Sequence, residues 1–576
     1  MAVVSAATIA AFLPSLRNGF VNFDDDRLLL HNPYLKLALA DQLAWMWSTT
    51  FLGHYQPLTW LSLAFDYAVA GLAPLAYHLD SLLWHTAAAL LLYSVLVDLA
   101  RRAQAPAAGD ASRLRICAAA AALFWAIHPL RVESVAWIAE RRDPISIVFL
   151  LLAVRAYLGA VDAAGTRDAA RRSHTIACVW LAVSLLAKAW GMTFFITLIA
   201  IDVYPLRRLP LDRSALTSPR YRPIWREKIP YALVGAAAGA IAWFAQHGEP
   251  DTMVAAAAWP WSARWLQASY GLCFYVWKTI WPAHLAVLYA RPDPLRPWPL
   301  AFYASAIIVP TAVLLIVRSA RAHPAVAMAS LVYAATVAPV LGLAQSGPQL
   351  VADRYAYAAS LPFSALLAGA LFLRPRGWQR STATAACIAM LAALASVTWR
   401  ATTVWHDSVQ LWGHALAAGQ SSYVAHMNYG QAVRAEGRVD EAIAHYRMAL
   451  ALDPRAGNAW YNLANALKAQ GRLDEAVDAY QTAIAHLSWK VDAQVNLGNL
   501  YFSRGQLALA IVQYRAATAA LARVPPAELS PEPFLYLGIA LSDHGDRAEA
   551  REALSIAARY PATRVRALRE LRRIGS

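Results

Sequence analysis

Residues 20–26 read Phe-Val-Asn-Phe-Asp-Asp-Asp and come directly after the first apolar segment of the chain. Three consecutive carboxylates need an explanation in a chain that is otherwise mostly lipid-soluble, because acids in or beside a membrane are costly and usually mark a site. We therefore expect residues 20–26 to form a catalytic centre around which the apolar segments are arranged. Two further polar clusters, at 128–143 and 353–355, fall on loops that the predicted topology places on the same face of the membrane.

The composition is that of a polytopic membrane protein. Of 576 residues, 59% are hydrophobic and 15% are charged, and the mean hydropathy is +0.37. Soluble domains contain about 25% charged residues. The formal net charge is +15, but the arginines and lysines gather in short loops between apolar runs. This distribution indicates membrane orientation, so we expect contact with membrane lipid and no nucleic-acid partner.

The apolar segments before residue 405 predict about eleven membrane crossings. We expect them at 1–16, 77–99, 116–127, 144–160, 175–187, 190–205, 229–245, 299–317, 324–343, 355–373 and 381–399. The stretch 265–290 is ambiguous, and we interpret it as a re-entrant or tilted segment. A full crossing there would put Arg318 and Arg321 on the outer side, against the positive-inside rule. This topology places the amino terminus inside and the carboxyl terminus outside.

An internal repeat begins at about residue 421. Asn428, Asn462 and Asn496 are 34 residues apart, and three sets of small residues keep the same spacing: Gly437, Gly471 and Gly505; Ala442, Ala476 and Ala510; and Ala449, Ala483 and Ala517. A 34-residue period with small residues where paired helices touch predicts tetratricopeptide repeats, about four of them. The groove of such an array is expected to bind an acceptor protein or peptide; a structural cap or an oligomerisation surface is the alternative.

The predicted fold class is therefore all-α, with a polytopic membrane domain followed by a helical solenoid. We expect the membrane domain at 1–404, a connector at 405–420 and the repeats at 421–576.

The acidic stretch can act in two ways. A carboxylate beside the membrane can serve as general base toward an acceptor hydroxyl, and a neighbouring carboxylate can hold a divalent metal or orient the acceptor. Asp24, Asp25 and Asp26 are the candidates for these roles, and a metal, if one binds, would be held by Asp24 and Asp25. The alternative is a solvated acidic turn whose carboxylates pair with Arg27.

Residues 128–143 carry an unusual density of charge beside lipid. They include His128, Arg131, Glu133, Glu140, Arg141, Arg142 and Asp143. Structural ion pairs explain part of this run, yet it also suits a phosphate-bearing ligand. Residues 132–141 can form an interfacial helix on which Glu133, Trp137 and Glu140 or Arg141 share a face.

Two further cations are candidates for phosphate contacts. Arg354 offers a planar fork for bidentate contact with phosphate, or it pairs locally with Asp353. Lys188, between two apolar segments, is either another phosphate contact or a snorkelling lysine. The sequence contains no P-loop, Rossmann glycine pattern, Ser-His-Asp spacing or zinc signature, so nucleotide-driven chemistry is not expected.

Several motifs together resemble a known family. They are Phe20 to Asp25 with Asn32-Pro33, Pro57-Leu58-Thr59-Trp60-Leu61-Ser62, His128-Pro129-Leu130, Val132-Glu133-Ser134-Val135-Ala136-Trp137, Arg141-Arg142-Asp143, Ala352-Asp353-Arg354-Tyr355 and Trp405-His406-Asp407-Ser408. In combination they look like bacterial relatives of the TMTC proteins, which are transmembrane O-mannosyltransferases with a GT-C fold and carboxyl-terminal tetratricopeptide repeats. The resemblance covers nearly the whole chain.

The resemblance implies an inverting GT-C glycosyltransferase. Its expected donor is a polyprenyl-phosphate sugar, and its expected acceptors are Ser or Thr hydroxyls of proteins on the periplasmic face of a bacterial inner membrane. No cofactor is expected with certainty beyond this lipid-linked donor, and a divalent metal is the open alternative. Transfer to a lipid or glycan acceptor and a noncatalytic membrane scaffold are the competing interpretations.

The resemblance also implies roles for individual residues. Asp24 or Asp25 would be the base, and the donor phosphate would be bound by Arg354, Arg141, Arg142 and Lys188. Supporting or substrate-binding roles would fall to Asp26, His128, Arg131, Glu133, Asp143, Asp353, Tyr355, Tyr55 and Gln56. The chain departs from its relatives at 187–189, which read Ala-Lys-Ala where relatives often have Ser-Lys-Pro or Ser-Lys-Glu, and at Gln56, which is Arg in some relatives.

Overall fold

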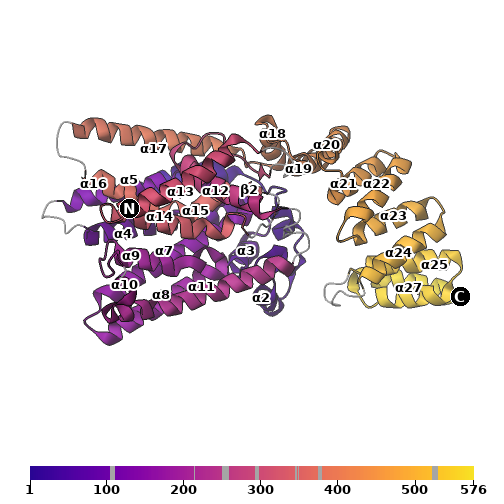
Figure 1. Ribbon diagram of the computed structural model, residues 1–576. Helices are drawn as coiled ribbons and strands as arrows, with labels where there is room; N and C mark the ends of the chain where they lie inside the picture. Colours follow the sequence, from indigo (N-terminus) through magenta and orange to yellow (C-terminus); the bar gives the residue numbers. More distant parts are fainter. Residues whose placement is uncertain are drawn as a thin grey trace. The chain divides into compact units, whose positions relative to one another are not determined.

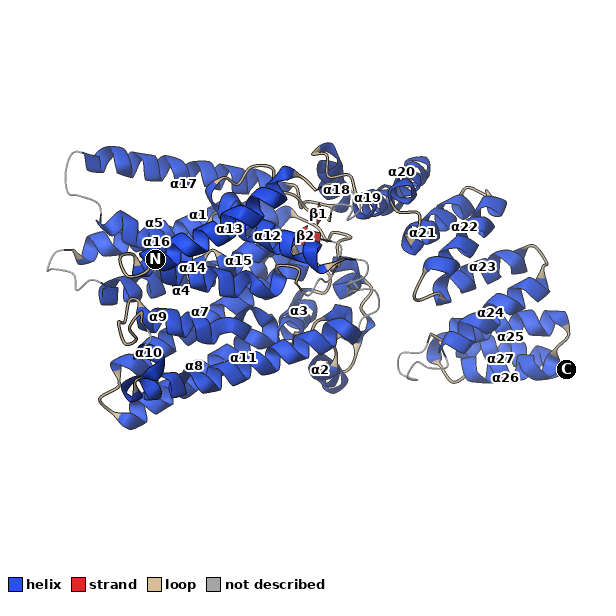
Figure 2. Ribbon diagram, viewed as in Figure 1, coloured by secondary structure: helices blue, strands red, loops and turns tan. Residues whose placement is uncertain are grey.

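The computed structural model describes all residues except 104–109, 213, 249–258, 292–297, 344–346, 348, 374–378, 522–529 and 576. It divides into two compact units, Met1–Gln420 and Ser421–Ser576, here called unit 1 and unit 2 (Figure 1). Both units are built from helices (Figure 2), and strands among the described residues form one two-stranded sheet. The prediction of an all-α fold is confirmed.

Unit 1 begins with helices that frame the acidic stretch and the first polar loops: α1 (Ala2–Phe12), α2 (Leu39–Ser48), α3 (Pro57–Ala70), α4 (Pro74–Ala103), α5 (Ala111–Ala126), α6 (Val132–Ala136), α7 (Arg142–Asp162), α8 (Arg167–Ala187) and α9 (Phe194–Val203). It continues with α10 (Ser214–Thr217), α11 (Arg222–Gly248), α12 (Trp261–Ile280), α13 (Leu300–Ser319), α14 (Pro324–Val337), α15 (Ala356–Ala359), α16 (Leu361–Leu373), α17 (Gln379–Thr403) and α18 (Ser408–Ala417).

Short turns of other helix types join these elements. They are η1 (Leu13–Arg17), η2 (Asp26–Leu30), η3 (Pro33–Lys36), η4 (Phe51–Gly53), η5 (Pro129–Arg131), η6 (Ile138–Arg141), η7 (Ala189–Thr193), η8 (Pro219–Tyr221), η9 (Ala338–Val340) and η10 (Asp353–Tyr355). Strand β1 (Tyr289–Ala290) pairs antiparallel with β2 (Gln349–Val351). This pairing brings the chain after α12 beside the segment that leads into η10.

Several helices of unit 1 are suited to a membrane. Within the described residues, five are long and apolar enough to cross it: Pro74–Ala103, Ile138–Asp162, Pro219–Gly248, Leu300–Ser319 and Thr384–Thr403. Two bent pairs, Ala111–Ala126 with Pro129–Ala136 and Asp353–Ala359 with Leu361–Leu373, raise the number to seven if each is one span. Unit 1 is thus a multi-pass membrane domain.

The expected number of about eleven crossings is higher than this. The expected crossings 1–16, 190–205 and 324–343 coincide with the shorter apolar helices Ala2–Arg17, Ala189–Val203 and Pro324–Val340. The expected crossing 175–187 is the second half of α8, whose first half is strongly basic. In the ambiguous stretch 265–290, α12 ends at Ile280, and the chain then continues into β1.

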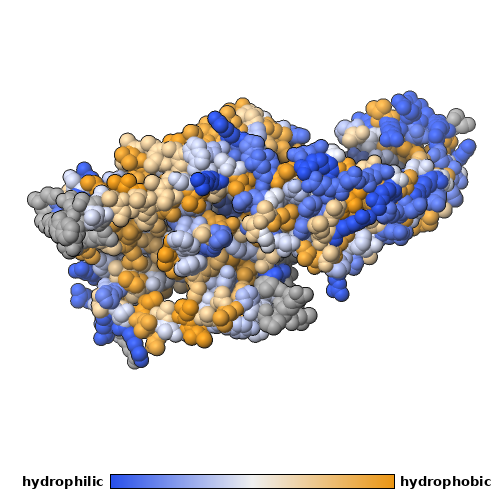
Figure 3. Space-filling model, turned by 90° about the horizontal axis from the view of Figure 1, so that it is seen from above, coloured by the Kyte–Doolittle hydropathy of each residue, from blue (hydrophilic) through white to orange (hydrophobic). Residues whose placement is uncertain are grey.

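Lipid-facing surface is visible on the outer helices of unit 1. Large apolar side chains on α11 and α13 are strongly exposed, including Leu233, Phe244, Leu300 and Ile307. In the view of Figure 3, orange and tan residues cover much of unit 1, whereas blue residues predominate on unit 2. A helix of a soluble domain would bury such side chains, so this surface indicates a lipid environment for unit 1.

Residues 405–420, expected to be a connector, pack within unit 1. Gly19 N donates a hydrogen bond of 2.7 Å to the His406 carbonyl. The Trp412 indole donates to Asn22 Oδ1 at 2.8 Å, and Trp405 stacks against Trp137 with ring centroids 5.7 Å apart. The contacts of Gly19 and Asn22 hold the backbone just before the three consecutive aspartates.

Unit 2 consists of successive antiparallel helix pairs, as the 34-residue repeat predicts. Its helices are α19 (Tyr423–Ala435), α20 (Val439–Leu452), α21 (Gly457–Ala469), α22 (Leu473–His486), α23 (Val491–Ser503), α24 (Leu507–Leu521), α25 (Glu532–His544), α26 (Arg547–Ala557) and α27 (Pro561–Gly575). The turn glycines have positive φ, for example 83° at Gly437, a conformation that favours glycine. A Cβ on Gly498 would lie 2.6 Å from the Tyr514 ring, so the close helix contact requires a small residue there.

Candidate functional site

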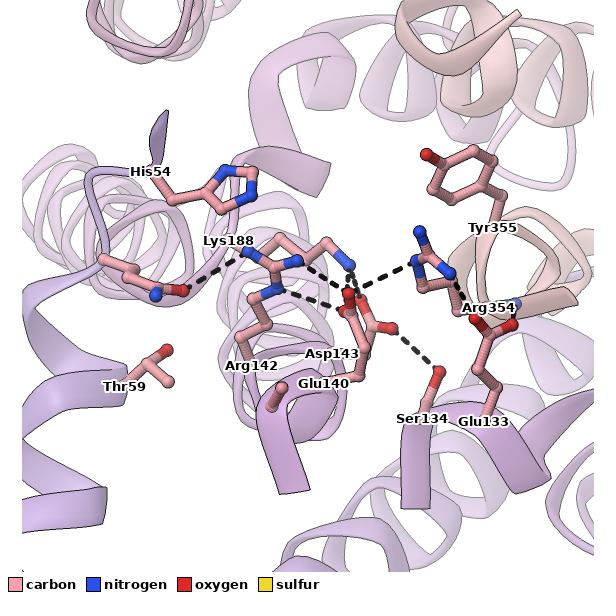
Figure 4. A network of polar contacts seen from close by, with 12 residues as sticks. His54, Thr59, Glu133, Ser134, Glu140, Arg142, Asp143, Lys188, Arg354 and Tyr355 are labelled. Carbon is pink, nitrogen blue, oxygen red and sulfur yellow. Dashed lines mark hydrogen bonds and ion pairs between the residues drawn. The ribbon is translucent and has the colours of Figure 1, made fainter. Parts of the chain in front are cut away.

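Charged side chains from four separate segments of unit 1 form one cluster (Figure 4). We call it the acid–base cluster; its members are Glu133, Glu140, Arg142, Asp143, Lys188 and Arg354. They come from α6, the junction of η6 with α7, the break between α8 and η7, and η10. The cluster therefore exists only in the folded chain.

Glu140 lies at the centre of the cluster. Its carboxylate forms ion pairs with three cations: Arg142 through Nη2 at 2.6 Å, Lys188 through Nζ at 2.6 Å and Arg354 through Nε at 3.2 Å. One carboxylate thereby fixes three cations relative to one another.

Two more carboxylates complete the cluster. Glu133 accepts a hydrogen bond from Arg354 N at 2.8 Å and forms an ion pair with Arg354 Nη1. Asp143 lies 2.7 Å from Lys188 Nζ and accepts from the Trp190 indole at 2.5 Å and from Ser134 Oγ at 2.8 Å. Three cations and three acids balance, which lets so many charges share a confined space.

The cations face open space and the acids lie behind them. The side chains of Arg354, Arg142 and Lys188 are 11%, 13% and 17% exposed, whereas Glu140 and Asp143 are 0% exposed. Among the described residues, Arg354 Nη2 has no hydrogen-bond partner. An anion approaching from the open side would meet positioned donors that need no rearrangement.

Asp24 is the carboxylate of the acidic stretch that remains free. Its backbone has φ 73°, which is unusual for a residue with a side chain and is found mostly where function or tertiary contacts impose it. Within the described part of the chain, its side chain makes no hydrogen bond or ion pair. Burial raises the pKa of Asp24, while the charges of Arg142, Arg27 and Arg354 act in the opposite direction. Asp24 is thus a partly exposed acid in the field of the cluster's cations.

Asp25 has a different environment. It is 1% exposed, and its two carboxylate oxygens accept from Val21 N at 3.2 Å and from Ala139 N at 3.1 Å. Burial raises its pKa to about 8 against the opposing effect of these two hydrogen bonds. Asp25 fastens the acidic stretch to η6.

The bond from Ala139 also explains a wrong prediction. Residues 132–141 do not form one helix: α6 ends at Ala136, Trp137 is extended with φ −94° and ψ 116°, and η6 begins at Ile138. Asp25 takes the Ala139 N–H that a continuous helix would use, so a carboxylate distant in sequence competes with local helix formation. The break turns Glu140 and Arg142 toward the cluster and Arg141 away from it.

Arg141 does not join the acid–base cluster. Its fully buried guanidinium forms an ion pair with Asp66, lies 3.1 Å from Asp80 Oδ2, and donates to Ser81 Oγ at 3.1 Å and to the Tyr77 carbonyl at 2.5 Å. These partners belong to α3 and α4. The expected role of Arg141 in binding phosphate therefore has no geometric support, and the residue joins helices instead.

His128 and Arg131 are likewise turned toward structural partners. His128 Nδ1 accepts from Leu130 N at 3.3 Å, and its Nε2 lies 3.1 Å from the Thr279 carbonyl. Arg131 is buried and donates to the Ala356 carbonyl at 2.8 Å and to Ser360 Oγ at 2.9 Å. Both side chains join the loop after α5 to other elements of unit 1.

The other expected site residues lie around the cluster. Asp353 accepts from Tyr289 Oη at 3.0 Å, and Tyr355 Oη accepts from Gln349 Nε2 at 3.0 Å. Gln56 is buried, with its Oε1 3.5 Å from Arg142 Nη1. The remaining two are bound locally: Tyr55 Oη donates to the Trp47 carbonyl at 3.2 Å, and Asp26 Oδ1 accepts from Arg27 N at 2.9 Å.

Sequence reasoning missed the roles of Glu140, Trp190 and His54. Glu140 was one of several charges in its run, and its central position depends on cations from other segments. Trp190 follows Lys188 closely in the sequence. An indole N–H next to this lysine was the one available signal that Trp190 would donate a hydrogen bond within the same site. Burial, with a smaller contribution from Arg142, holds the pKa of His54 well below its usual range. His54 therefore stays neutral beside the cluster (Figure 4).

A metal site is not evident in the part of the chain that the structure describes. No group of three or more His, Cys, Asp or Glu side chains there is placed to hold a metal ion. Asp24 and Asp25, the expected ligands, differ in environment, since both oxygens of Asp25 already accept backbone N–H groups.

Comparison with known proteins identifies the repeats and the relatives of the chain. Family models described as "TPR repeat" and "Tetratricopeptide repeat" match residues 430–471 and 457–487. The crystal structure of YrrB, described as a TPR protein with an unusual peptide-binding site, is 19% identical and covers 28% of this chain and 81% of its own, with a TM-score of 0.26.

The similar curated proteins share one description. Protein O-mannosyl-transferase Tmtc3 of Drosophila melanogaster is 28% identical over 36% of this chain and 24% of its own length, and Tmtc1 of the same organism is 32% identical over 27% and 18%. Human protein O-mannosyl-transferase TMTC1 is 24% identical over 80% of this chain and 55% of its own. The chain thus covers well under two thirds of each of these proteins. This chain combines apolar helices suited to a membrane with carboxyl-terminal tetratricopeptide repeats, and its homologues are TMTC protein O-mannosyl-transferases.

Proposed function

We propose that this chain is an inverting GT-C-type glycosyltransferase that moves a sugar from a polyprenyl-phosphate donor to Ser or Thr hydroxyls of proteins. The reaction would take place at the outer, periplasmic face of a bacterial inner membrane. The observation that carries the proposal is a carboxylate, Asp24, that has no hydrogen bond or ion pair among the described residues and lies in the electrostatic field of Arg142 and Arg354, two cations that buried acids hold in place. The names of the homologues, protein O-mannosyl-transferases, support the same reaction class.

Asp24 is the proposed general base. It accepts the proton of the acceptor hydroxyl while the hydroxyl oxygen forms a bond to the anomeric carbon of the donor sugar. The bond between that carbon and the phosphate oxygen breaks on the opposite face, and polyprenyl phosphate leaves with the electron pair. Of the two candidate acids, Asp24 is preferred because both oxygens of Asp25 accept backbone N–H groups.

The cations of the cluster stabilise the leaving phosphate. Arg354, Arg142 and Lys188 all contact Glu140, and Arg354 also pairs with Glu133 and Lys188 with Asp143. Their side chains remain partly exposed, and Arg354 Nη2 has no partner among the described residues. Because Glu140 positions them before the donor arrives, little reorganisation is needed as negative charge develops on the phosphate. Arg141 has no part in this step, since its guanidinium is committed to α3 and α4.

The repeats are proposed to present the acceptor. Tetratricopeptide arrays form extended concave surfaces, and a segment held there is at a high local concentration for a site on the same chain. The YrrB description mentions a peptide-binding site, and an acceptor protein or peptide is the corresponding partner proposed for unit 2.

The test follows radiolabelled sugar from defined donors in membranes that contain the full chain. Polyprenyl-phosphate mannose is the first donor to supply, because the homologues are named mannosyl-transferases; polyprenyl-phosphate glucose is the second. The expected result is label on Ser or Thr of proteins with the wild type and its loss with Asp24→Asn.

The matched control is Asp41→Asn, an exposed acid of α2 in the same outer segment. It should label protein as the wild type does. If the label appeared only on lipid or glycan, the acceptor would be a lipid or a glycan and not a protein, and this part of the proposal would be wrong. Absence of any label that depends on Asp24 would favour a noncatalytic scaffold.

A further inference from the structure

A cavity of about 630 Å³ lies among the end of α9, the chain that follows it, η8 with the start of α11, and the turn between α13 and α14. In Figure 1, α9 and α10 lie at one end of unit 1, whereas α2, α3 and β2 lie at the other. The cavity is therefore remote from the acid–base cluster. Four arginines line it, Arg207, Arg208, Arg220 and Arg321, together with one acid, Asp212. We call this cavity the arginine pocket.

Three of the four arginines are available to a ligand. Arg207, Arg220 and Arg321 are exposed, and within the described residues none of them forms an ion pair. Asp212 does not balance them, because it is a single exposed acid whose Oδ1 accepts from Ser214 N at 2.8 Å. The pocket thus carries an excess of positive charge, which favours an anionic occupant.

The base of the pocket is held rigidly. Arg208 Nη1 lies 2.9 Å from buried Asp202, which also receives Lys228 Nζ at 2.7 Å and Tyr157 Oη at 2.7 Å. Arg208 N and Leu209 N donate to the Asp202 carbonyl at 2.7 and 3.2 Å. These bonds fasten the chain after α9 to α7 and α11. The pocket is therefore pre-formed and does not need a ligand to order it.

The backbone of Arg207 adds an independent observation. It has φ 55°, a left-handed conformation that costs energy for a residue with a side chain and that the bonds of Arg208 and Leu209 next to it maintain. Such conformations cluster at ligand-binding and active sites.

The surroundings of the arginines are apolar. Leu209, Leu211 and Ile224 form part of the wall, and Val317, Val326 and Ile229, close in sequence to the lining, are 67%, 43% and 54% exposed. Exposed apolar side chains at the ends of α11, α13 and α14 suit acyl chains, while guanidinium groups suit phosphate. The volume also lies in the range of about 300–1,000 Å³ that is typical of ligand sites.

We propose that the arginine pocket binds the phosphate group of an anionic membrane lipid, with the acyl chains lying along the exposed apolar residues of α11, α13 and α14. Arg207, Arg220 and Arg321 contact the phosphate, and Arg208 is held in the wall by Asp202. Binding at this end fastens the turn between α13 and α14 to the chain after α9. This site is separate from the proposed glycosyl transfer and does not depend on it.

The test measures lipid binding to the full-length protein in neutral detergent by native mass spectrometry. The probes are phosphatidylglycerol, zwitterionic phosphatidylcholine and inorganic phosphate. The test variant combines Arg207→Gln, Arg220→Gln and Arg321→Gln, all at exposed positions where folding is not at risk. The matched control combines Arg167→Gln, Arg171→Gln and Arg172→Gln, three exposed arginines of α8 that do not line the cavity and that change the net charge equally.

Each arginine near an anionic headgroup contributes roughly a fivefold factor, so the pocket variant should bind phosphatidylglycerol roughly 100-fold more weakly. The control should bind nearly as the wild type does, and phosphatidylcholine should bind weakly to all three proteins. An equal loss in both triple variants would overturn the proposal in favour of nonspecific attraction to charge. Inorganic phosphate binding as tightly as phosphatidylglycerol would overturn the lipid as the occupant.

Discussion

The acid–base cluster and the arginine pocket both bring several cations together in unit 1. They differ in whether buried carboxylates balance the positive charge. In the cluster every cation has a buried carboxylate behind it, and Glu140 alone contacts Arg142, Lys188 and Arg354. In the pocket only Arg208 is held in this manner, and Arg207 is exposed without an ion pair among the described residues. The first arrangement fixes donors for a reaction, while the second leaves charge unbalanced for a ligand to neutralise.

The largest effect on stability is expected from Arg141→Gln. Removing this guanidinium leaves buried Asp66 without its ion-pair partner, and breaking a buried pair on one side costs about 3–5 kcal/mol. The midpoint of thermal unfolding in detergent checks this against Arg171→Gln on the exposed face of α8. A midpoint equal to that of Arg171→Gln would contradict the structural role of Arg141.

The neighbouring arginine is expected to behave in the opposite way. Arg142→Gln should lower sugar transfer about 10²–10³-fold, because it removes a positioned donor for the leaving phosphate. Glu140 still forms ion pairs with Lys188 and Arg354 in this variant, so the midpoint of thermal unfolding should fall less than with Arg141→Gln. Initial rates of transfer and unfolding midpoints of both variants test the division. Equal rates for Arg142→Gln and the wild type would remove Arg142 from the site.

Asp25→Asn should lower the stability of the folded protein. Asparagine replaces one of the two acceptor oxygens by an amide, so the Val21 or the Ala139 N–H loses its partner, at a cost of about 1–3 kcal/mol. Thermal unfolding of Asp25→Asn and Asp24→Asn side by side provides the measurement. A lower midpoint for Asp24→Asn than for Asp25→Asn would contradict the assignment of the two acids.

The same residue predicts a dependence of stability on pH. Burial raises the pKa of Asp25 to about 8, so the folded chain binds a proton that the unfolded chain releases above its ordinary pKa. The contribution to stability is complete below the unfolded pKa and is lost as the pH rises through about 8, with a slope of up to about 1.4 kcal/mol per pH unit. Unfolding midpoints from pH 5 to pH 8 should fall more steeply for the wild type than for Asp25→Asn. Parallel curves would contradict this explanation.

The smallest effect is expected in the arginine pocket. Arg207→Gln and Arg220→Gln should each change the free energy of unfolding by less than about 0.5 kcal/mol in lipid-free detergent, because these exposed cations form no ion pair with any residue that the structure describes. Denaturation in the same detergent measures the change. A loss as large as that of Arg141→Gln would mean that the pocket arginines are structural after all.

The repeats were predictable because their determinants recur at a fixed spacing. Buried Ala442, Ala476 and Ala510, each 0% exposed, occupy the contact between paired helices that a 34-residue period implies. The membrane helices were predictable from their apolar runs, although their number was not, because short and bent helices do not count simply as crossings.

The candidate site was predictable as a group of segments and not as an arrangement of side chains. Asp24 and Asp25 are adjacent in the sequence and have the same side-chain chemistry. The hydrogen bonds that Asp25 accepts from Val21 N and from the distant Ala139 N distinguish it as the structural acid of the two. Arg141 and Arg142 differ for a similar reason, since the break at Trp137 directs them to opposite sides. Glu140 acquires its central position from cations contributed by α8 and η10 as well as by its own segment.

The most direct test of the central claim is the initial rate of sugar transfer by purified Asp24→Asn protein, measured with a polyprenyl-phosphate donor and a Ser- or Thr-containing acceptor. Asparagine tolerates the left-handed backbone at this position, so the variant should unfold at the wild-type temperature. Loss of the general base predicts a rate about 10²–10⁴-fold below that of the wild type, with Asp41→Asn unaffected. A folded Asp24→Asn protein that transfers sugar at the wild-type rate would contradict the assignment of Asp24 as the base.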